Sequence, residues 1–137
     1  MFKQICFFKK RPDISLDEFL DYYENQHSQL SKKMGRAPSI PNAVRYVRRY
    51  LKAEKNPVTG DVHDCGYDCL MEIWWNSRDD FEASQKLIGD PERLAYIKAD
   101  EAKLFASHAN PVYTVEEYDS PMGPNGEATH VELNYYD

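Results

Sequence analysis

The chain has 137 residues and a formal net charge of −6. This length predicts one domain, and the acidic balance argues against a nucleic-acid partner because no basic stripe is present to neutralise phosphates. Three cysteines do not make a disulfide framework, and lysines interrupt the short apolar stretch at the N-terminus. We therefore expect a cytoplasmic protein with no signal peptide and no membrane-spanning segment.

The N-terminal strand, predicted over residues 2–9, is apolar on both faces. Ile5 and Phe7 share one face, and Cys6 and Phe8 share the other. One helical layer covers only one face of a sheet, so the second face needs another sheet. The pattern therefore predicts that two copies pair through this face as a homodimer.

An amphipathic helix is predicted over residues 15–30. Ser15 and Glu18 have the spacing of a capping box, which satisfies free amides at a helix start. A stripe with 3.6-residue spacing follows, made of Leu16, Phe19, Leu20, Tyr23, His27 and Leu30. His27 lies near the middle of this stripe, so its imidazole should face the core or a space that the core encloses.

Two further strands are predicted over residues 43–52 and 67–75, joined by a turn-rich loop that overhangs the sheet. In the third strand, Cys69, Met71 and Ile73 share the face that we expect beneath the helices. The other face mixes acids with apolar bulk, namely Asp68, Leu70, Glu72 and Trp74. This mixture predicts the wall of a pocket.

A helix from Ser77 to Ile88, a second helix after Asp90-Pro91 and a strand over 112–118 complete the predicted domain. The order is β-α-β-β-α-β with the second helix in two pieces, which predicts a ferredoxin-like α+β sandwich. The domain is expected to span residues 1–118. Residues 119–137 are expected to form a C-terminal arm that contacts the partner subunit. Within it, residues 129–136 form either a last short strand or an extended arm.

The segment from Lys9 to Leu30 resembles the opening motif of the EthD family, K-R-x-P-x-(I/L)-S-x-x-E-F-x-x-Y-(W/Y)-x-x-x-H. The matching residues are Lys10, Arg11, Pro12, Ile14, Ser15, Glu18, Phe19, Tyr22, Tyr23 and His27. Two later pieces agree, Tyr67-Asp68 through Glu72-Ile73-Trp74-Trp75 and Asp100-Glu101-Ala102-Lys103-Leu104-Phe105 before Val115-Glu116-Glu117. The chain differs in having Gln29 where the family often has proline and Tyr23 where it often has tryptophan.

This resemblance implies a dimeric α+β barrel whose cofactor-free chemistry acts on small aromatic or polyketide-like substrates, as in the catabolism of aromatic compounds. The reactions it implies are dehydration, decarboxylation or cyclisation, of the lyase or isomerase type. Related barrels include monooxygenases that work without a cofactor or with haem. Another alternative is a non-catalytic accessory protein that supports an oxygenase in a degradation pathway.

We expect His27 to act as the general base or acid, because an apolar wall disfavours its charged form. Glu72 is expected to orient His27 or to relay its proton, and Tyr46 to hold the substrate oxygen. The alternative for His27 is a buried histidine bonded to a backbone carbonyl, and that for Tyr46 is an ordinary core or interface aromatic. The alternative for Glu72 is a solvated glutamate at an edge, or one paired with Arg45 or Arg48.

Seven further residues are expected to bind the small phenolic or ketonic substrate: Phe8, Tyr23, Tyr50, Asp68, Leu70, Trp74 and His108. His108 has an alternative role as a partner of the dipole at a helix C-terminus. His63, Asp64 and Cys65 are adjacent in sequence and cannot all converge on one ion, which argues against a zinc site. Neither a phosphate-binding glycine loop nor a dinucleotide fingerprint is present.

Overall fold

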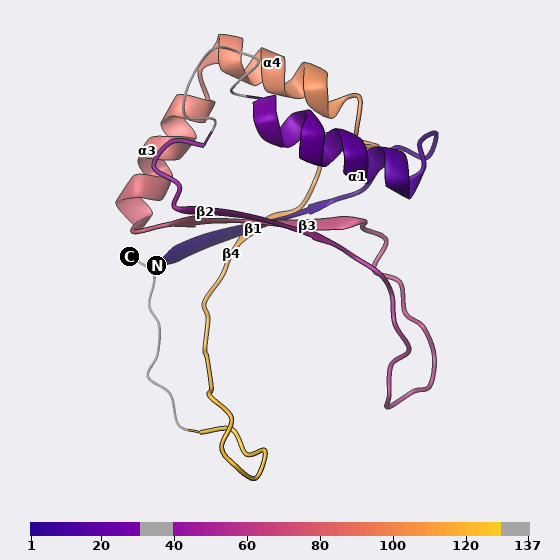
Figure 1. Cartoon of the computed structure of the whole chain (residues 1–137). Helices are drawn as coiled ribbons and strands as arrows, with labels where there is room; N and C mark the ends of the chain where they lie inside the picture. Colours follow the sequence, from indigo (N-terminus) through magenta and orange to yellow (C-terminus); the bar gives the residue numbers. More distant parts are fainter. Residues whose placement is uncertain (31–39, 130–137) are drawn as a thin grey trace.

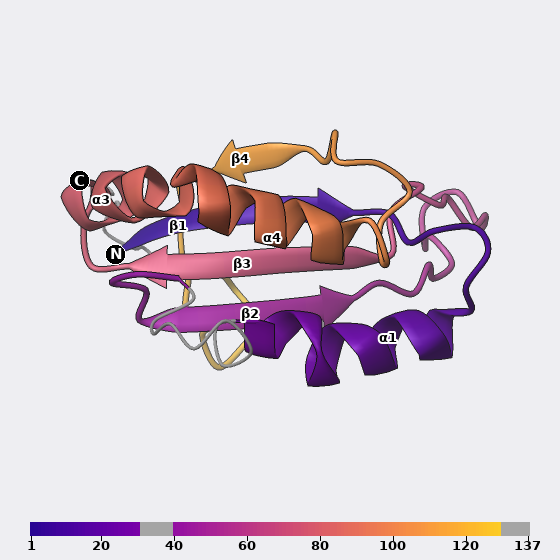
Figure 2. The ribbon, with the colours of Figure 1, turned by 90° about the horizontal axis from the view of Figure 1, so that it is seen from above.

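The computed structural model describes residues 1–30 and 40–129. Its elements are β1 (Phe2–Phe8), α1 (Leu16–Asn25), the 3₁₀ helix η1 (His27–Gln29), β2 (Arg45–Tyr50), β3 (Cys69–Trp75), α3 (Arg78–Ile88), α4 (Pro91–Glu101) and β4 (Val112–Thr114). The strands form one antiparallel sheet in the order β2-β3-β1-β4, and the α-helices lie on one side of it (Figures 1 and 2). This arrangement confirms the predicted ferredoxin-like α+β sandwich.

The helix α1 begins as its sequence predicts and ends earlier. The Ser15 hydroxyl accepts a hydrogen bond from the Glu18 amide at 3.1 Å, as an N-cap should. The predicted helix continues to residue 30, whereas α1 ends at Asn25 and the chain tightens into η1. Ser28 contributes to this change, because its hydroxyl donates to the Glu24 carbonyl at 2.6 Å and competes with the backbone for that acceptor.

The helices α3 and α4 begin at the predicted caps. The Ser77 hydroxyl accepts from the Asp80 amide, and the Asp90 carboxylate accepts from the Arg93 amide, both at 3.1 Å. Pro91 occupies the first turn of α4, where its missing N–H leaves no bond unmade. The break between the two helices was therefore predictable from local chemistry.

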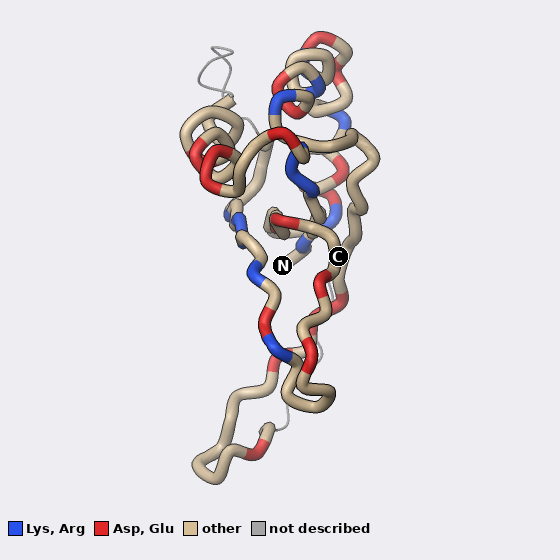
Figure 3. The backbone as a smooth tube through the Cα atoms, turned by 90° about the vertical axis from the view of Figure 1, so that its right-hand side faces the viewer, with Lys and Arg blue, Asp and Glu red and all other residues tan. Residues whose placement is uncertain are grey.

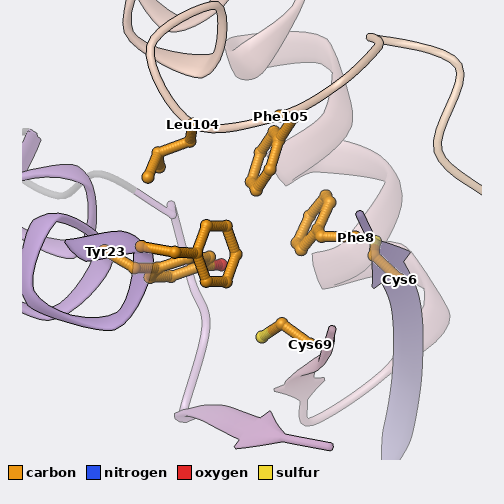
Figure 4. Close-up of a cluster of buried hydrophobic side chains, with 7 residues drawn as sticks. Cys6, Phe8, Tyr23, Cys69, Leu104 and Phe105 are labelled. Carbon is orange, nitrogen blue, oxygen red and sulfur yellow. The ribbon is translucent and has the colours of Figure 1, made fainter. Parts of the chain in front are cut away.

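Aromatic side chains fill the space between the sheet and the helices. Phe8 of β1 stacks on Phe105, with ring centroids 4.3 Å apart, while Tyr23 of α1 packs beside both rings (Figure 4). A second cluster at the other end of the sheet joins Phe2, Ile73 and Trp75. Burial of each such side chain contributes roughly 2–3 kcal/mol to folding.

The strand register separates the two faces of the sheet. Phe2 pairs with Trp75 and Phe8 with Cys69, so these residues face the helices, as predicted for the odd-numbered residues of β3. Neighbouring positions such as Ile5 and its partner Glu72 face away from the helices. We call this second surface the open face.

Two extended segments project beyond the sheet on the side of the open face. They are the connection between β2 and β3 and the chain that follows β4 (Figures 1 and 3). The first is the predicted overhanging loop. The strand predicted over 112–118 is shorter in the structure, where β4 pairs with β1 only through Val112–Thr114. The last strand predicted over 129–136 lies almost wholly outside the described residues.

Candidate functional site

A cavity of about 350 Å³ lies between the sheet and the helices. Its walls are mainly apolar and include Cys6, Phe8, Leu30, Ile40, Met71, Ile73, Ile88, Ile97 and Val112. The polar side chains that reach it are Gln4, Tyr23, His27, Ser28, Tyr46, Gln85, Glu101, His108 and Asn110. An apolar chamber with a few convergent polar groups is the common form of a small-molecule site.

His27 is held at this cavity by a buried carboxylate. Its Nδ1 atom lies 2.7 Å from Oδ2 of Asp100, at the end of α4. The imidazole packs edge-on against Tyr23 and Phe105, with ring centroids 5.2 and 5.8 Å away. Because Asp100 occupies Nδ1, Nε2 is the nitrogen that remains for a molecule in the cavity, and it has no partner among the described residues.

Tyr22 fixes the other oxygen of Asp100. Its hydroxyl donates to Oδ1 at 2.6 Å, and Asp100 as a whole is only 6% exposed. Burial, together with the hydrogen bond to this carboxylate, raises the pKa of Tyr22 to about 12. Tyr22 therefore stays a neutral donor, and the row Tyr22–Asp100–His27 holds one orientation of the imidazole.

A pair of phenols lies on the same side of the sheet. The hydroxyls of Tyr23 and Tyr46 are 3.0 Å apart, and both side chains line the cavity. Burial raises the pKa of Tyr46 to about 12 and that of Tyr23 well above its usual value. Both groups therefore remain protonated at neutral pH, so that Tyr46 can donate a hydrogen bond to an oxygen atom.

A second histidine at the cavity also has a carboxylate partner. Nδ1 of His108 lies 3.1 Å from Oε2 of Glu101, the last residue of α4. Asp100 and Glu101 are thus neighbours in sequence that contact different histidines. His108, which the sequence predicts among the substrate-binding residues, thus lies at the cavity.

The structure brings five of the ten predicted site residues to the cavity. They are Phe8, Tyr23, His27, Tyr46 and His108. The other five, Tyr50, Asp68, Leu70, Glu72 and Trp74, do not line it. The even-numbered face of β3, predicted to form the wall of the pocket, lies on the other side of the sheet from this cavity, which lies above Met71 and Ile73.

Glu72 cannot orient His27, since the two residues lie on opposite sides of the sheet. Its carboxylate accepts hydrogen bonds from Arg49 and from the indole N–H of Trp74, each at 2.5 Å. Leu70 lies with Glu72 and Arg49 around a shallower hollow of the open face. The alternative role of Glu72 in an ion pair agrees with this contact, although the partner is Arg49 and not Arg45 or Arg48.

The remaining two predicted residues have structural partners. Asp68 accepts a hydrogen bond from the amide of Lys10 at 2.9 Å, which joins the start of β3 to the end of β1. Tyr50 donates to Glu24, which also binds the guanidinium of Arg48. The bonds of Glu24 attach α1 to β2. Neither Asp68 nor Tyr50 is at the cavity.

Asp100 is the functional candidate that residue-by-residue reasoning missed. It appeared only as part of the Asp-Glu pair in the family motif, because nothing in the spacing of α4 distinguishes its inward acid from an exposed one. A buried carboxylate needs a donor, and His27 was the available inward-facing donor. Pairing His27 with this acid would have predicted Asp100 in the site.

Within residues 1–30 and 40–129, no group of three or more His, Cys, Asp or Glu side chains is arranged to hold a metal ion. The same described residues include no helix that is long and apolar enough to cross a membrane.

Comparison with protein-family models gives a match to the EthD domain over residues 11–108. Comparison with curated proteins gives no match. Among solved structures, an EthD family protein from Bacillus halodurans has a TM-score of 0.54 and 17% identity, covering 86% of this chain and 100% of the other.

Two plant proteins are also similar in structure. A protein from Arabidopsis thaliana has a TM-score of 0.50 and 13% identity, covering 89% of this chain and 100% of its own. A hydroxynitrile lyase from Passiflora edulis has a TM-score of 0.50 and 15% identity, with coverages of 86% and 95%. At these identities the likeness shows a shared fold.

Proposed function

Because the chain belongs to the EthD domain family, we propose that it is an enzyme that transfers protons on a small, flat ketonic or phenolic substrate. The reaction is of the lyase or isomerase type and needs no cofactor. One observation carries this proposal. His27 is oriented by the buried Asp100 at the wall of an apolar cavity.

In the proposed reaction, Nε2 of His27 takes a proton from a carbon next to the substrate carbonyl. Asp100 stabilises the imidazolium that results, since its carboxylate already faces Nδ1. Tyr46 donates a hydrogen bond to the carbonyl oxygen, where negative charge develops. A positioned general base contributes about 10²–10⁴-fold to such a step.

The apolar walls support the same chemistry. They exclude water, and a low-dielectric cavity strengthens both the hydrogen bond from Tyr46 and the attraction between imidazolium and carboxylate. The name of the Passiflora neighbour, a hydroxynitrile lyase, is in keeping with a lyase reaction. The substrate class is proposed from the rings of Phe8 and Tyr23 in the cavity wall and from the phenol donor Tyr46.

We also propose that the open face packs against a second copy of the chain. Ile5, Phe7 and Leu70 lie on this face, only partly covered by their own chain. The two projecting segments lie on the side of this face (Figure 1). Such packing would cover the apolar bulk that no helix covers.

The experiment uses 4-phenylbutan-2-one in D₂O, with deuterium incorporation next to the carbonyl followed by proton NMR. The native protein is expected to accelerate incorporation, and His27→Gln to lose at least about 100-fold of that rate. His63→Gln is the matched control, because His63 lies in the exposed connection between β2 and β3. Equal rates for His27→Gln and native protein would disprove the role of His27, and so would the absence of native activity.

A further inference from the structure

The end of α4 positions two histidines with two consecutive acids. Asp100 faces Tyr22 and His27, whereas Glu101 faces His108. Both imidazoles line the same cavity, and each uses Nδ1 for its carboxylate. Each therefore has Nε2 as the nitrogen available to a bound molecule.

The two pairs differ in their access to solvent. The His27 side chain is 12% exposed, whereas that of His108 is 49% exposed. The His27 imidazole is bonded to Asp100 and packed against Tyr23 and Phe105, which suits proton removal in a dry environment. A half-exposed imidazole exchanges protons with bulk water directly and can be reprotonated after each turnover.

Glu101 itself lines the cavity, and its charge acts on a second group in the cavity wall. Burial is the main cause that raises the pKa of the Cys6 thiol to about 12, and the charge of Glu101 adds to it. Cys6 belongs to the cavity wall on β1. The Glu101 carboxylate thus acts on the cavity as well as on His108.

We propose that His108, positioned by Glu101, is the proton donor to a leaving oxygen on the same substrate. This inference rests on the proposed function, and it defines the substrate as a β-hydroxy ketone. Gln4, Gln85 and Asn110 also line the cavity and provide neutral polar groups for the hydroxyl end.

The atoms and electrons of the elimination balance with His27 as the base and His108 as the acid. His27 takes the proton from the carbon between the carbonyl and the hydroxyl-bearing carbon, and the C–H electron pair becomes the enolate. The enolate then forms the carbon–carbon double bond as the C–O bond breaks. His108 gives its proton to the departing oxygen, which leaves as water. Solvent restores the proton of His108 and removes that of His27.

The test uses 4-hydroxy-4-phenylbutan-2-one in D₂O, a probe that reports the two steps separately. Deuterium incorporation next to the carbonyl reports His27, and absorbance of the unsaturated ketone reports elimination. We expect His108→Gln to keep incorporation within about threefold of native and to lose at least about 100-fold of elimination. His63→Gln is again the control for the substitution itself.

Glu101 is tested as a positioning residue. Glu101→Gln is expected to lower kcat for elimination by about tenfold, with KM and deuterium incorporation little changed. The control is Glu82→Gln, which alters an exposed glutamate paired with Arg78 on α3. A loss of incorporation equal to the loss of elimination would show a structural effect and contradict the proposed role.

Three outcomes with the hydroxyketone probe would overturn the proposal. They are elimination by His108→Gln at the native rate, equal loss of both signals in that variant, and native incorporation without elimination. If native protein gives neither signal, the proposed function fails on its own. The proposed place of His108 at the second oxygen is then tested with benzoylacetone, whose two oxygens have the same spacing as those of the hydroxyketone. Binding is followed by NMR of the histidine rings. We expect shifts at both His27 and His108, and a lack of shift at His108 would overturn it.

Discussion

The two faces of the sheet use their polar groups differently. On the helix side, His27 is bonded to Asp100 through one nitrogen, and its other nitrogen remains for the cavity. On the open face, Lys3 binds Glu117 at 2.8 Å and lies 3.7 Å from the centre of the Trp74 ring. The helix side thus leaves an imidazole nitrogen at a cavity, whereas the charges of the open face pair with one another.

The neighbouring tryptophans of β3 give the largest expected difference between the faces. Trp75 is fully buried, with its indole N–H bonded to the Pro41 carbonyl at 3.1 Å, and it packs on Phe81. Trp75→Ala should lower the free energy of unfolding by about 3–5 kcal/mol, because it leaves a large cavity. Trp74→Ala should cost only about 1 kcal/mol, mainly from lost cation–π contacts.

Urea unfolding at low protein concentration measures the loss of unfolding free energy in each variant, with the chain as a monomer. Sedimentation measures self-association. Trp74→Ala should weaken self-association because Trp74 lies on the open face. Equal losses of stability in the two variants would remove the proposed distinction between the faces.

The buried phenols predict a second difference, in the response to high pH. The pKa of Tyr46 is raised to about 12 by burial, so the native state holds this proton more tightly than the unfolded state does. Stability should therefore fall between pH 10 and pH 12, by about 3 kcal/mol for this group. Tyr46→Phe should flatten that part of the stability curve.

The control for this prediction is Tyr113→Phe, which changes an exposed tyrosine of β4. Urea midpoints measured at pH 10 and pH 12 provide the comparison. If the Tyr46 and Tyr113 variants lose stability equally over this interval, burial of Tyr46 does not set its ionisation.

The fold was predictable from sequence because its signals are local. Ser15, Ser77 and Asp90 each cap a helix, and the apolar alternation of β1 and β3 defines strands. Choosing the face of β3 that lines the cavity requires knowing where the helices leave space, which is a property of packing. For that reason Glu72 was predicted in the site and Asp100 was not paired with His27.

The smallest effect is expected from the outer member of the row that holds His27. Tyr22→Phe removes the hydrogen bond to Asp100 and keeps the ring. The rate of deuterium incorporation into 4-phenylbutan-2-one should fall about tenfold, close to the worth of one hydrogen bond to a charged group. The fall should appear in kcat, with KM nearly unchanged.

Tyr118→Phe is the matched control, because Tyr118 also donates to a carboxylate, that of Glu116, but is exposed. A tenfold loss in this control, or none in Tyr22→Phe, would contradict the role given to Tyr22.

Two buried carboxylates on opposite faces allow the most direct test of the account. Asp100→Asn and Glu72→Gln each replace a charged acceptor with a neutral amide of similar shape, and both are assayed for deuterium incorporation into 4-phenylbutan-2-one. We expect Asp100→Asn to lose at least about 100-fold of the native rate and Glu72→Gln to stay within about twofold. A large loss in Glu72→Gln with Asp100→Asn unaffected would place the chemistry on the open face and contradict the account.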